Sequence, residues 1–275
     1  LLLCRTEDRI PNEQKSKIAL FCNLKPESVI EALDSSSIYE VPISYHKQGL
    51  DEQICKHFNL DLSKKINLSR WNKINEIQRS SDGNVNIGIV GKYTSLIDAY
   101  KSLIEAINHG GLDNNVKVTI KWVNSESLED QKLNLTNFFK DINGIIVPGG
   151  FGERGSEGKI NAIKYARLNN IPFFGICFGM QMAVIEFARN KLNIKKATSS
   201  EFGPSKASVV GLMSEWVKDG KKIKGTDKNL GGTMRLGSYE AKLKKRSLIS
   251  NIYDSLKINE RHRHRYEVNI NFKDE

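Results

Sequence analysis

The chain has 275 residues, of which 39% are hydrophobic, and a formal net charge of +10, so it can form one large or two smaller domains with real cores. It contains no run of apolar residues long enough for a membrane span, and the leucines at positions 1–3 are soon followed by Arg5, Glu7 and Asp8. We therefore expect no membrane partner, no signal peptide and a cytoplasmic location. Because Leu1 is not a methionine and positions 1–3 resemble the inside of a buried strand, we also expect a piece of a longer protein.

The positive charge alone does not define a partner. Clustered lysine and arginine suit a nucleic acid, a membrane surface or an anionic substrate. Most lysines here are spread along the chain, and the densest basic cluster is Arg-His-Arg-His-Arg at residues 261–265. A solvated basic surface explains that cluster equally well, so the residues by themselves leave the alternatives open.

The four cysteines, Cys4, Cys22, Cys55 and Cys177, are far apart and form no C-x-x-C pair. This spacing predicts neither a zinc site nor a disulfide framework, so we expect reduced thiols. Cys4 and Cys22 lie in apolar contexts typical of small core residues.

Residues 1–60 form a first predicted unit, with strand-like runs at residues 1–4 and 18–21. The polar stretch that follows ends in the turn sequence Ser-Ser-Asp-Gly at residues 80–83, and we interpret residues 61–83 as a linker.

From residue 84 onward, short β-branched runs alternate with helix-like stretches, which is the pattern of parallel strands joined by crossover helices. The predicted strands are residues 85–91, 116–123, 144–147 and 172–177, and the helices are residues 95–109 and 158–169. Further strands are expected at 208–213, 237–243 and 266–270. The predicted fold is therefore α/β, with an open, mostly parallel sheet and flanking helices.

The most informative motif is Gly-Ile-Cys-Phe-Gly at residues 175–179, between an apolar strand and an amphipathic helix. Such a sharp strand-to-helix turn exposes a nucleophile, and side chains in place of Gly175 or Gly179 would crowd it. The helix N-terminus also favours the thiolate form of Cys177. A buried structural cysteine between chance glycines is the competing interpretation.

A second strand, residues 144–147, ends in Pro-Gly-Gly-Phe-Gly at residues 148–152. The carboxyl ends of parallel strands meet at one edge, so this turn can face Cys177. The backbone N–H groups of Gly150 and Phe178 could then form an oxyanion hole. A phosphate loop or a plain turn are the alternatives, although a Walker pattern is absent: Tyr93 follows Gly91-Lys92, and Ile160 follows Gly158-Lys159.

Together these two turns resemble the triad-type glutamine amidotransferases, and other segments narrow the resemblance to the CTP synthase family. These segments include Lys-Ile-Ala-Leu-Phe-Cys at 17–22, Leu-Gly-Gly-Thr-Met-Arg-Leu-Gly at 230–237 and Glu-Arg-His-Arg-His-Arg-Tyr-Glu at 260–267. The resemblance covers nearly the whole chain. It implies the tail of a P-loop-type α/β synthetase domain at 1–60, the linker at 61–83, and a glutamine amidotransferase domain at 84–275.

The resemblance also implies an activity: ATP-dependent amination of UTP to CTP, using ammonia from glutamine. It implies Mg²⁺ and ATP, with sites mostly outside this chain, GTP as activator, CTP as feedback inhibitor and a homotetramer. No nucleic acid and no metal ligand within this chain are expected.

Site residues follow from the resemblance one by one. Cys177 would be the nucleophile, Glu201 would meet the substrate ammonium, and Arg265 would pair with its carboxylate. Lys17 aligns with a lysine that contacts nucleotide phosphates in the family. The residues implied to line the glutamine pocket are Gly150, Phe178, Gly179, Met180, Gln181, Glu201 and Arg265.

The chain departs from the family in one respect, because the family's His-x-Glu pair, which follows the Arg-His-Arg-Tyr segment, is absent. The residues two positions after the five histidines are Gln48, Asn59, Gly111, His264 and Tyr266. Truncation explains this absence best, and a chain without its base would have little or no turnover alone. A nonenzymatic assembly or binding remnant of the family is the alternative, and a nucleic-acid binder is a weaker one.

Overall fold

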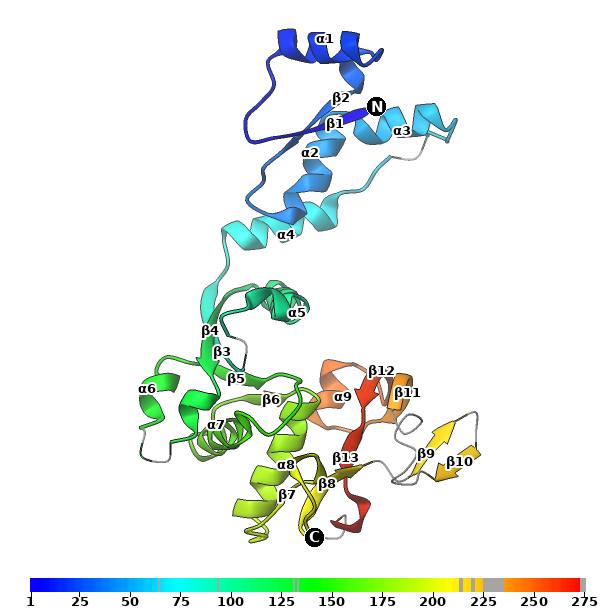
Figure 1. Ribbon diagram of the computed structural model, residues 1–275. Helices are drawn as coiled ribbons and strands as arrows, with labels where there is room; N and C mark the ends of the chain where they lie inside the picture. Colours follow the sequence, from blue (N-terminus) through cyan, green and yellow to red (C-terminus); the bar gives the residue numbers. More distant parts are fainter. Residues whose placement is uncertain are drawn as a thin grey trace. The chain divides into compact units, whose positions relative to one another are not determined.

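The computed structural model describes residues 1–63, 65–92, 94–130, 132, 134–212, 215–218, 221–224 and 235–272. The chain forms two compact units, each described by itself (Figure 1). The first comprises Leu1–Asn84 and Glu105–Val118, and the second comprises Val85–Ile104 and Thr119–Glu275. None of the described helices is long and apolar enough to cross a membrane.

The first unit is built on two parallel strands, β1 (Leu2–Thr6) and β2 (Val29–Leu33). The crossover between them contains α1 (Asn12–Phe21) and the short helix η1 (Pro26–Ser28). After β2 come η2 (Ile38–Glu40), α2 (Val41–Lys47), α3 (Leu50–His57) and α4 (Ser69–Arg79). Both α1 and α2 contact β2, which explains why β2 is almost completely buried.

The strand predicted at residues 18–21 is wrong, because these residues form the last turn of α1. A short apolar run fits a strand and a helix equally well, and the preceding residues decide. Pro11 precedes the helix, and Asn12–Phe21 then continues with strong helix formers that include Glu13 and Lys15. Only Ala19 of this helix is buried.

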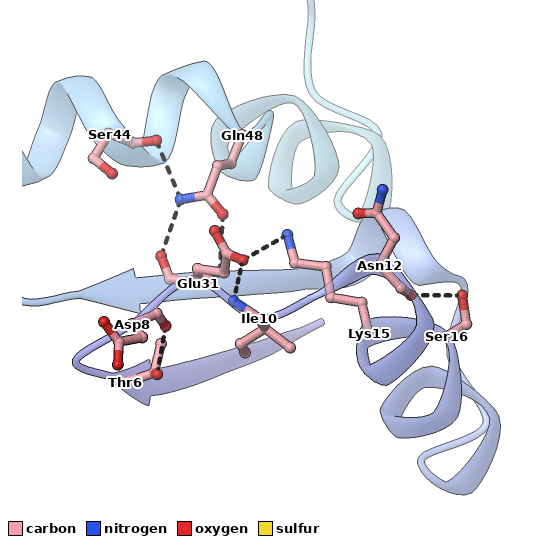
Figure 2. A network of polar contacts seen from close by, with 9 residues as sticks. All are labelled: Thr6, Asp8, Ile10, Asn12, Lys15, Ser16, Glu31, Ser44 and Gln48. Carbon is pink, nitrogen blue, oxygen red and sulfur yellow. Dashed lines mark hydrogen bonds and ion pairs between the residues drawn. The ribbon is translucent and has the colours of Figure 1, made fainter.

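A buried carboxylate ties the first unit together, as Figure 2 shows. The Glu31 side chain on β2 accepts a hydrogen bond of 2.8 Å from the backbone N–H of Ile10 and forms an ion pair of 3.3 Å with Lys15. The Gln48 amide exchanges two hydrogen bonds with the Glu31 backbone, at 2.8 and 2.9 Å. These contacts join β2 to the segment before α1 and to the end of α2.

The segment 61–83 contains a helix, α4, that packs on its own unit. The Asn75 side chain is buried and donates a 3.0 Å hydrogen bond to the backbone carbonyl of Tyr39. The Trp71 ring lies 6.1 Å from the Tyr39 ring between centroids. Part of the polar stretch is thus ordered against η2.

The second unit has a four-stranded sheet in the order β4-β3-β5-β6. Its strands are β3 (Gly83–Gly91), β4 (Val116–Asn124), β5 (Gly144–Val147) and β6 (Phe173–Gly175). The pairs β3–β5 and β5–β6 are parallel, as the sequence predicted. Helices α7 (Ser156–Leu168) and α8 (Phe178–Asn190) lie side by side and contact β5 and β6 (Figure 1).

The predicted helix at 95–109 corresponds to η3 (Ile97–Tyr100) followed by α5 (Lys101–Asp113). The remaining short helices are η4 (Glu126–Leu128), α6 (Thr136–Phe139), η5 (Ser200–Phe202), α9 (Leu248–Ile252) and η6 (Ile270–Phe272).

The C-terminal part adds small sheets beside α8. One sheet has the order β13-β8-β7, from Tyr266–Val268, Ser208–Leu212 and Thr198–Ser199. The others pair β9 (Glu215–Lys218) with β10 (Lys221–Lys224), and β11 (Arg235–Lys242) with β12 (Lys257–His264). The predicted strands at 208–213, 237–243 and 266–270 fall on β8, β11 and β13, although Met213 lies outside the described residues. Most of the motif at 230–237 also lies outside them.

Candidate active site

Cys177 occupies a strained turn between β6 and α8. Its backbone angles are φ 53° and ψ −106°, and it is the residue directly before the first turn of α8. A positive φ is unfavourable for a residue with a side chain and is typical of positions where function requires the strain. The structure thus gives Cys177 the elbow geometry that the sequence predicted.

The glycines around Cys177 are sterically required. A Cβ atom on Gly179 would lie 1.9 Å from the backbone oxygen of Val147, and one on Gly175 would lie 2.7 Å from the backbone of Gly179. Only glycine permits this close approach of α8 to β5 and β6. The elbow is therefore built by packing as well as by the local turn.

The glycine-rich turn after β5 lies beside the elbow. Val147 at the end of β5 pairs with Gly175 at the end of β6, so the segments that follow these two strands leave the sheet at the same edge. A Cβ atom on Gly149 would be 3.6 Å from the Cβ of Cys177. This places the turn that contains Gly150 against Cys177, which the predicted oxyanion hole requires.

Two charged side chains hold this turn. The Lys92 ammonium donates hydrogen bonds to the backbone oxygens of Phe151 and Gly152, the second at 3.2 Å. The N–H of Gly152 donates a 2.7 Å hydrogen bond to the Glu201 carboxylate. Glu201 therefore lies directly at the turn, in the short helix η5.

Glu201 and Arg265, which the sequence predicted as charged clamps for glutamine, line one cavity of about 340 Å³. Phe151, Arg263 and Tyr266 complete its wall. A cavity with a carboxylate and guanidinium groups suits a ligand that carries both an ammonium and a carboxylate.

His264 and Glu267 reach the same region, and the sequence prediction missed both. The His264 imidazole interacts with the side chain of Cys177, which is the largest cause of the shift in the His264 pKa. Its Nδ1 atom lies 3.5 Å from Oε1 of Glu267. The prediction considered only glutamates two positions after a histidine, whereas Glu267 is three positions after His264. A search at that wider spacing would have found the pair.

The charges of this group are strongly perturbed. The interactions with Cys177 and then with Glu267 raise the pKa of His264 to about 9, against the opposing effect of burial. Burial alone would raise the pKa of Glu267, but its 3.5 Å contact with His264 and the positive charge of Arg235 hold that pKa below its usual value. At neutral pH the structure therefore places an imidazolium between a sulfur atom and a carboxylate.

The other predicted residues differ in their surroundings. Gln181 is buried and donates a 2.8 Å hydrogen bond to the backbone carbonyl of Tyr266, so it fixes the strand beyond Arg265 to α8. Phe178 is fully buried, and Met180 is partly buried on α8. Lys17 lies in the first unit, is exposed on α1, and forms an ion pair of 2.7 Å with Glu13.

Among the described residues, one group has ligand atoms close enough for a metal ion: His262, His264 and Glu267, within 4.8 Å of one another. The Nδ1 atoms of the two histidines are 3.3 Å apart. The Arg235 guanidinium lies 3.5 Å from the Glu267 carboxylate and already balances its charge. This nitrogen-rich set also differs from the oxygen ligands that Mg²⁺ prefers.

Comparison with known proteins agrees with this geometry. Residues 95–275 match the family model of class-I glutamine amidotransferases, and residues 1–60 match the model of the CTP synthase N-terminus.

Two curated relatives show how far the similarity extends. The chain is 57% identical over 274 residues to the CTP synthase of Pelagibacter ubique, and 53% identical over 276 residues to that of Rhodospirillum rubrum. In both cases 100% of this chain matches 51% of the relative, so the chain spans about half the length of the curated relatives it matches.

A solved structure of the glutaminase domain of Trypanosoma brucei CTPS with bound acivicin is also similar. The identity is 39% and the TM-score is 0.60, over 69% of this chain and 70% of that chain. The elbow at Cys177, the adjoining glycine turn and these matches together show that the chain belongs to the class-I glutamine amidotransferases and, among them, to the CTP synthase family.

Proposed function

We propose that this chain contributes glutamine hydrolysis to a CTP synthase, with Cys177 as the nucleophile. The observation that carries the proposal is the strained elbow at Cys177, which lies beside the glycine turn that Glu201 holds. This arrangement of Cys177, the glycine turn and Glu201 favours an enzyme over a nonenzymatic remnant of the family.

The proposed reaction begins with glutamine in the cavity, its ammonium at Glu201 and its carboxylate at Arg265. The Cys177 sulfur attacks the carbonyl carbon of the side-chain amide, and the carbonyl oxygen takes the negative charge between the N–H groups of Gly150 and Phe178. Collapse of this intermediate breaks the carbon–nitrogen bond and leaves a thioester on Cys177. Water then hydrolyses the thioester, so that glutamine and water give glutamate and ammonia.

Proton transfer in this scheme falls to His264. Its pKa of about 9 means that His264 is protonated at neutral pH and can pass a proton to the departing nitrogen. Glu267 orients the imidazole through Nδ1. The family's His-x-Glu pair is not among these 275 residues, and the assignment of His264 rests on its interaction with Cys177.

For the whole protein we propose the family's reaction, in which ammonia aminates UTP to CTP at the expense of ATP. The described residues do not fit Mg²⁺, because their one group with suitable spacing is the histidine-rich set at Glu267. We therefore derive no step through a metal. A homotetramer, activation by GTP, inhibition by CTP, a cytoplasmic location and a nucleotide contact at Lys17 stay predictions.

A diazoketone analogue of glutamine tests the glutaminase proposal. We expect it to alkylate Cys177, with protection by glutamine and with no reaction of a Cys177→Ser variant. Cys55 provides the matched control, because Cys55→Ser should leave the rate of labelling unchanged. Peptide mapping that finds the adduct on another residue, or labelling without protection by glutamine, would contradict the site.

A further inference from the structure

A lysine is completely buried in the wall of the active site. Lys159 on α7 is 1% exposed, which is unusual for an ammonium group because burial removes its hydration. Packing fixes its position: a Cβ atom on the preceding residue, Gly158, would lie 1.8 Å from the backbone oxygen of Ser125. The first turn of α7 therefore cannot rotate to bring Lys159 to the surface.

The Lys159 ammonium lies behind both residues of the proposed oxyanion hole. Its Nζ atom is 4.7 Å from the centroid of the Phe178 ring, and Phe178 directly follows Cys177. The same Nζ atom is 3.5 Å from the position that a Cβ atom on Gly150 would occupy. The positive charge is thus held where solvent screens it poorly and where negative charge develops during acyl transfer.

Other charges surround this lysine. Burial, and then the like charge of Lys92, lower the pKa of Lys159 to about 8, while Glu201 acts in the opposite direction. Lys92 itself interacts with Arg154, and with the carboxylates Glu126 and Glu129. Lys159 therefore loses its charge near the upper end of the physiological pH range.

We propose that Lys159 is a positioning residue whose buried ammonium stabilises negative charge on the Cys177 sulfur and on the oxygen held at Gly150 and Phe178. Stabilisation of negative charge on the oxygen rests on the proposed glutaminase function, whereas stabilisation of negative charge on the Cys177 sulfur does not.

The test compares K159M with K164M in the 275-residue chain, because Lys164 is exposed on the same helix. Two reagents are used at Cys177: the diazoketone, which needs the glutamine pocket, and iodoacetamide, which needs only the thiolate. At about pH 7 we expect K159M to react about tenfold more slowly with both, from the loss of one nearby charge, and K164M to react normally.

Two further readouts separate electrostatics from a merely structural role. The rate ratio between the unaltered chain and K159M should approach one above about pH 9, because Lys159 is then neutral in the unaltered chain. K159M should also unfold at the same or a higher temperature, because an apolar side chain of similar length replaces a buried charge. K159Q serves as the second variant. The ratio of reaction rates between the unaltered chain and K159Q should depend on pH in the same way as the ratio for K159M.

An unchanged rate in K159M, or a ratio that does not vary with pH, would overturn the role of Lys159. Failure of the diazoketone to label the unaltered chain, with the tenfold iodoacetamide ratio retained, would instead overturn the glutaminase proposal and support the charge effect.

Discussion

The imidazole of His264 interacts with the side chain of Cys177, although the two residues come from different structural elements. Cys177 ends the turn before α8, and His264 is the last residue of β12. Their contact gives Cys177 a titratable partner.

Replacing His264 by Asn should slow alkylation of Cys177 by about a hundredfold to ten-thousandfold at neutral pH, the usual contribution of an acid–base partner. Cys177 would then lack the acid–base partner beside its sulfur. Diazoketone labelling followed by mass spectrometry measures the rate. His57→Asn is the control, because His57 is exposed in the first unit. Equal rates for H264N and the unaltered chain would show that the contact does not activate Cys177.

The stability of the folded chain should depend on pH through the same pair. His264 has a raised pKa in the folded chain. Its contribution to the free energy of unfolding is therefore fully present below its unfolded pKa of 6.5 and is lost as the pH rises through about 9. Glu267 has a lowered pKa, so its contribution is present above 4.5 and is lost as the pH falls through the folded value. Urea unfolding across the range above neutrality should show a steeper decline for the unaltered chain than for H264N. An equal dependence of the unfolding free energy on pH in the unaltered chain and in H264N would contradict the raised pKa of His264.

Gly179→Ala should destabilise the fold, because the new methyl group would lie 1.9 Å from the Val147 carbonyl oxygen in a packed core. Overpacking of this kind typically costs about 1–3 kcal/mol or more. The control is Gly110→Ala on α5, where nothing lies within 4 Å of the new Cβ. That control should be stabilised by roughly 0.5–1 kcal/mol through helix propensity. Thermal or urea unfolding measures both, and a G179A chain as stable as the unaltered one would refute the close packing.

Arg265→Gln should weaken glutamine binding, because the substrate carboxylate would lose its cationic partner. Arg265 is exposed, and a hydrogen bond to a charged group contributes roughly 1.5–3 kcal/mol, so glutamine should protect Cys177 from alkylation about tenfold less effectively. The comparison variant is Arg261→Gln, since Arg261 is exposed on β12 and is not among the residues that line the cavity. Equal protection in R265Q and R261Q would remove Arg265 from the site.

The strand–turn–helix at Cys177 was predictable because it depends on neighbouring residues. An apolar run, two glycines around a cysteine and a helical pattern specify a sharp turn whatever packs around it. The parallel strands β3 and β5 were predictable for the same reason, since buried strands are short apolar runs. The structure of residues 18–21 was not predictable, because their apolar side chains fit both a strand and the helix that they form.

The sequence by itself thus determined the sharp turn at Cys177, the glycine turn that faces it and the parallel sheet that presents both, since each depends on local spacing. Only the tertiary structure decided that His264 reaches the thiol, that Glu201 and Arg265 share one cavity, and that Lys159 is buried behind Phe178. The physical reason is that these contacts depend on where distant strands and helices pack and which face each side chain occupies. No spacing along the chain records that information.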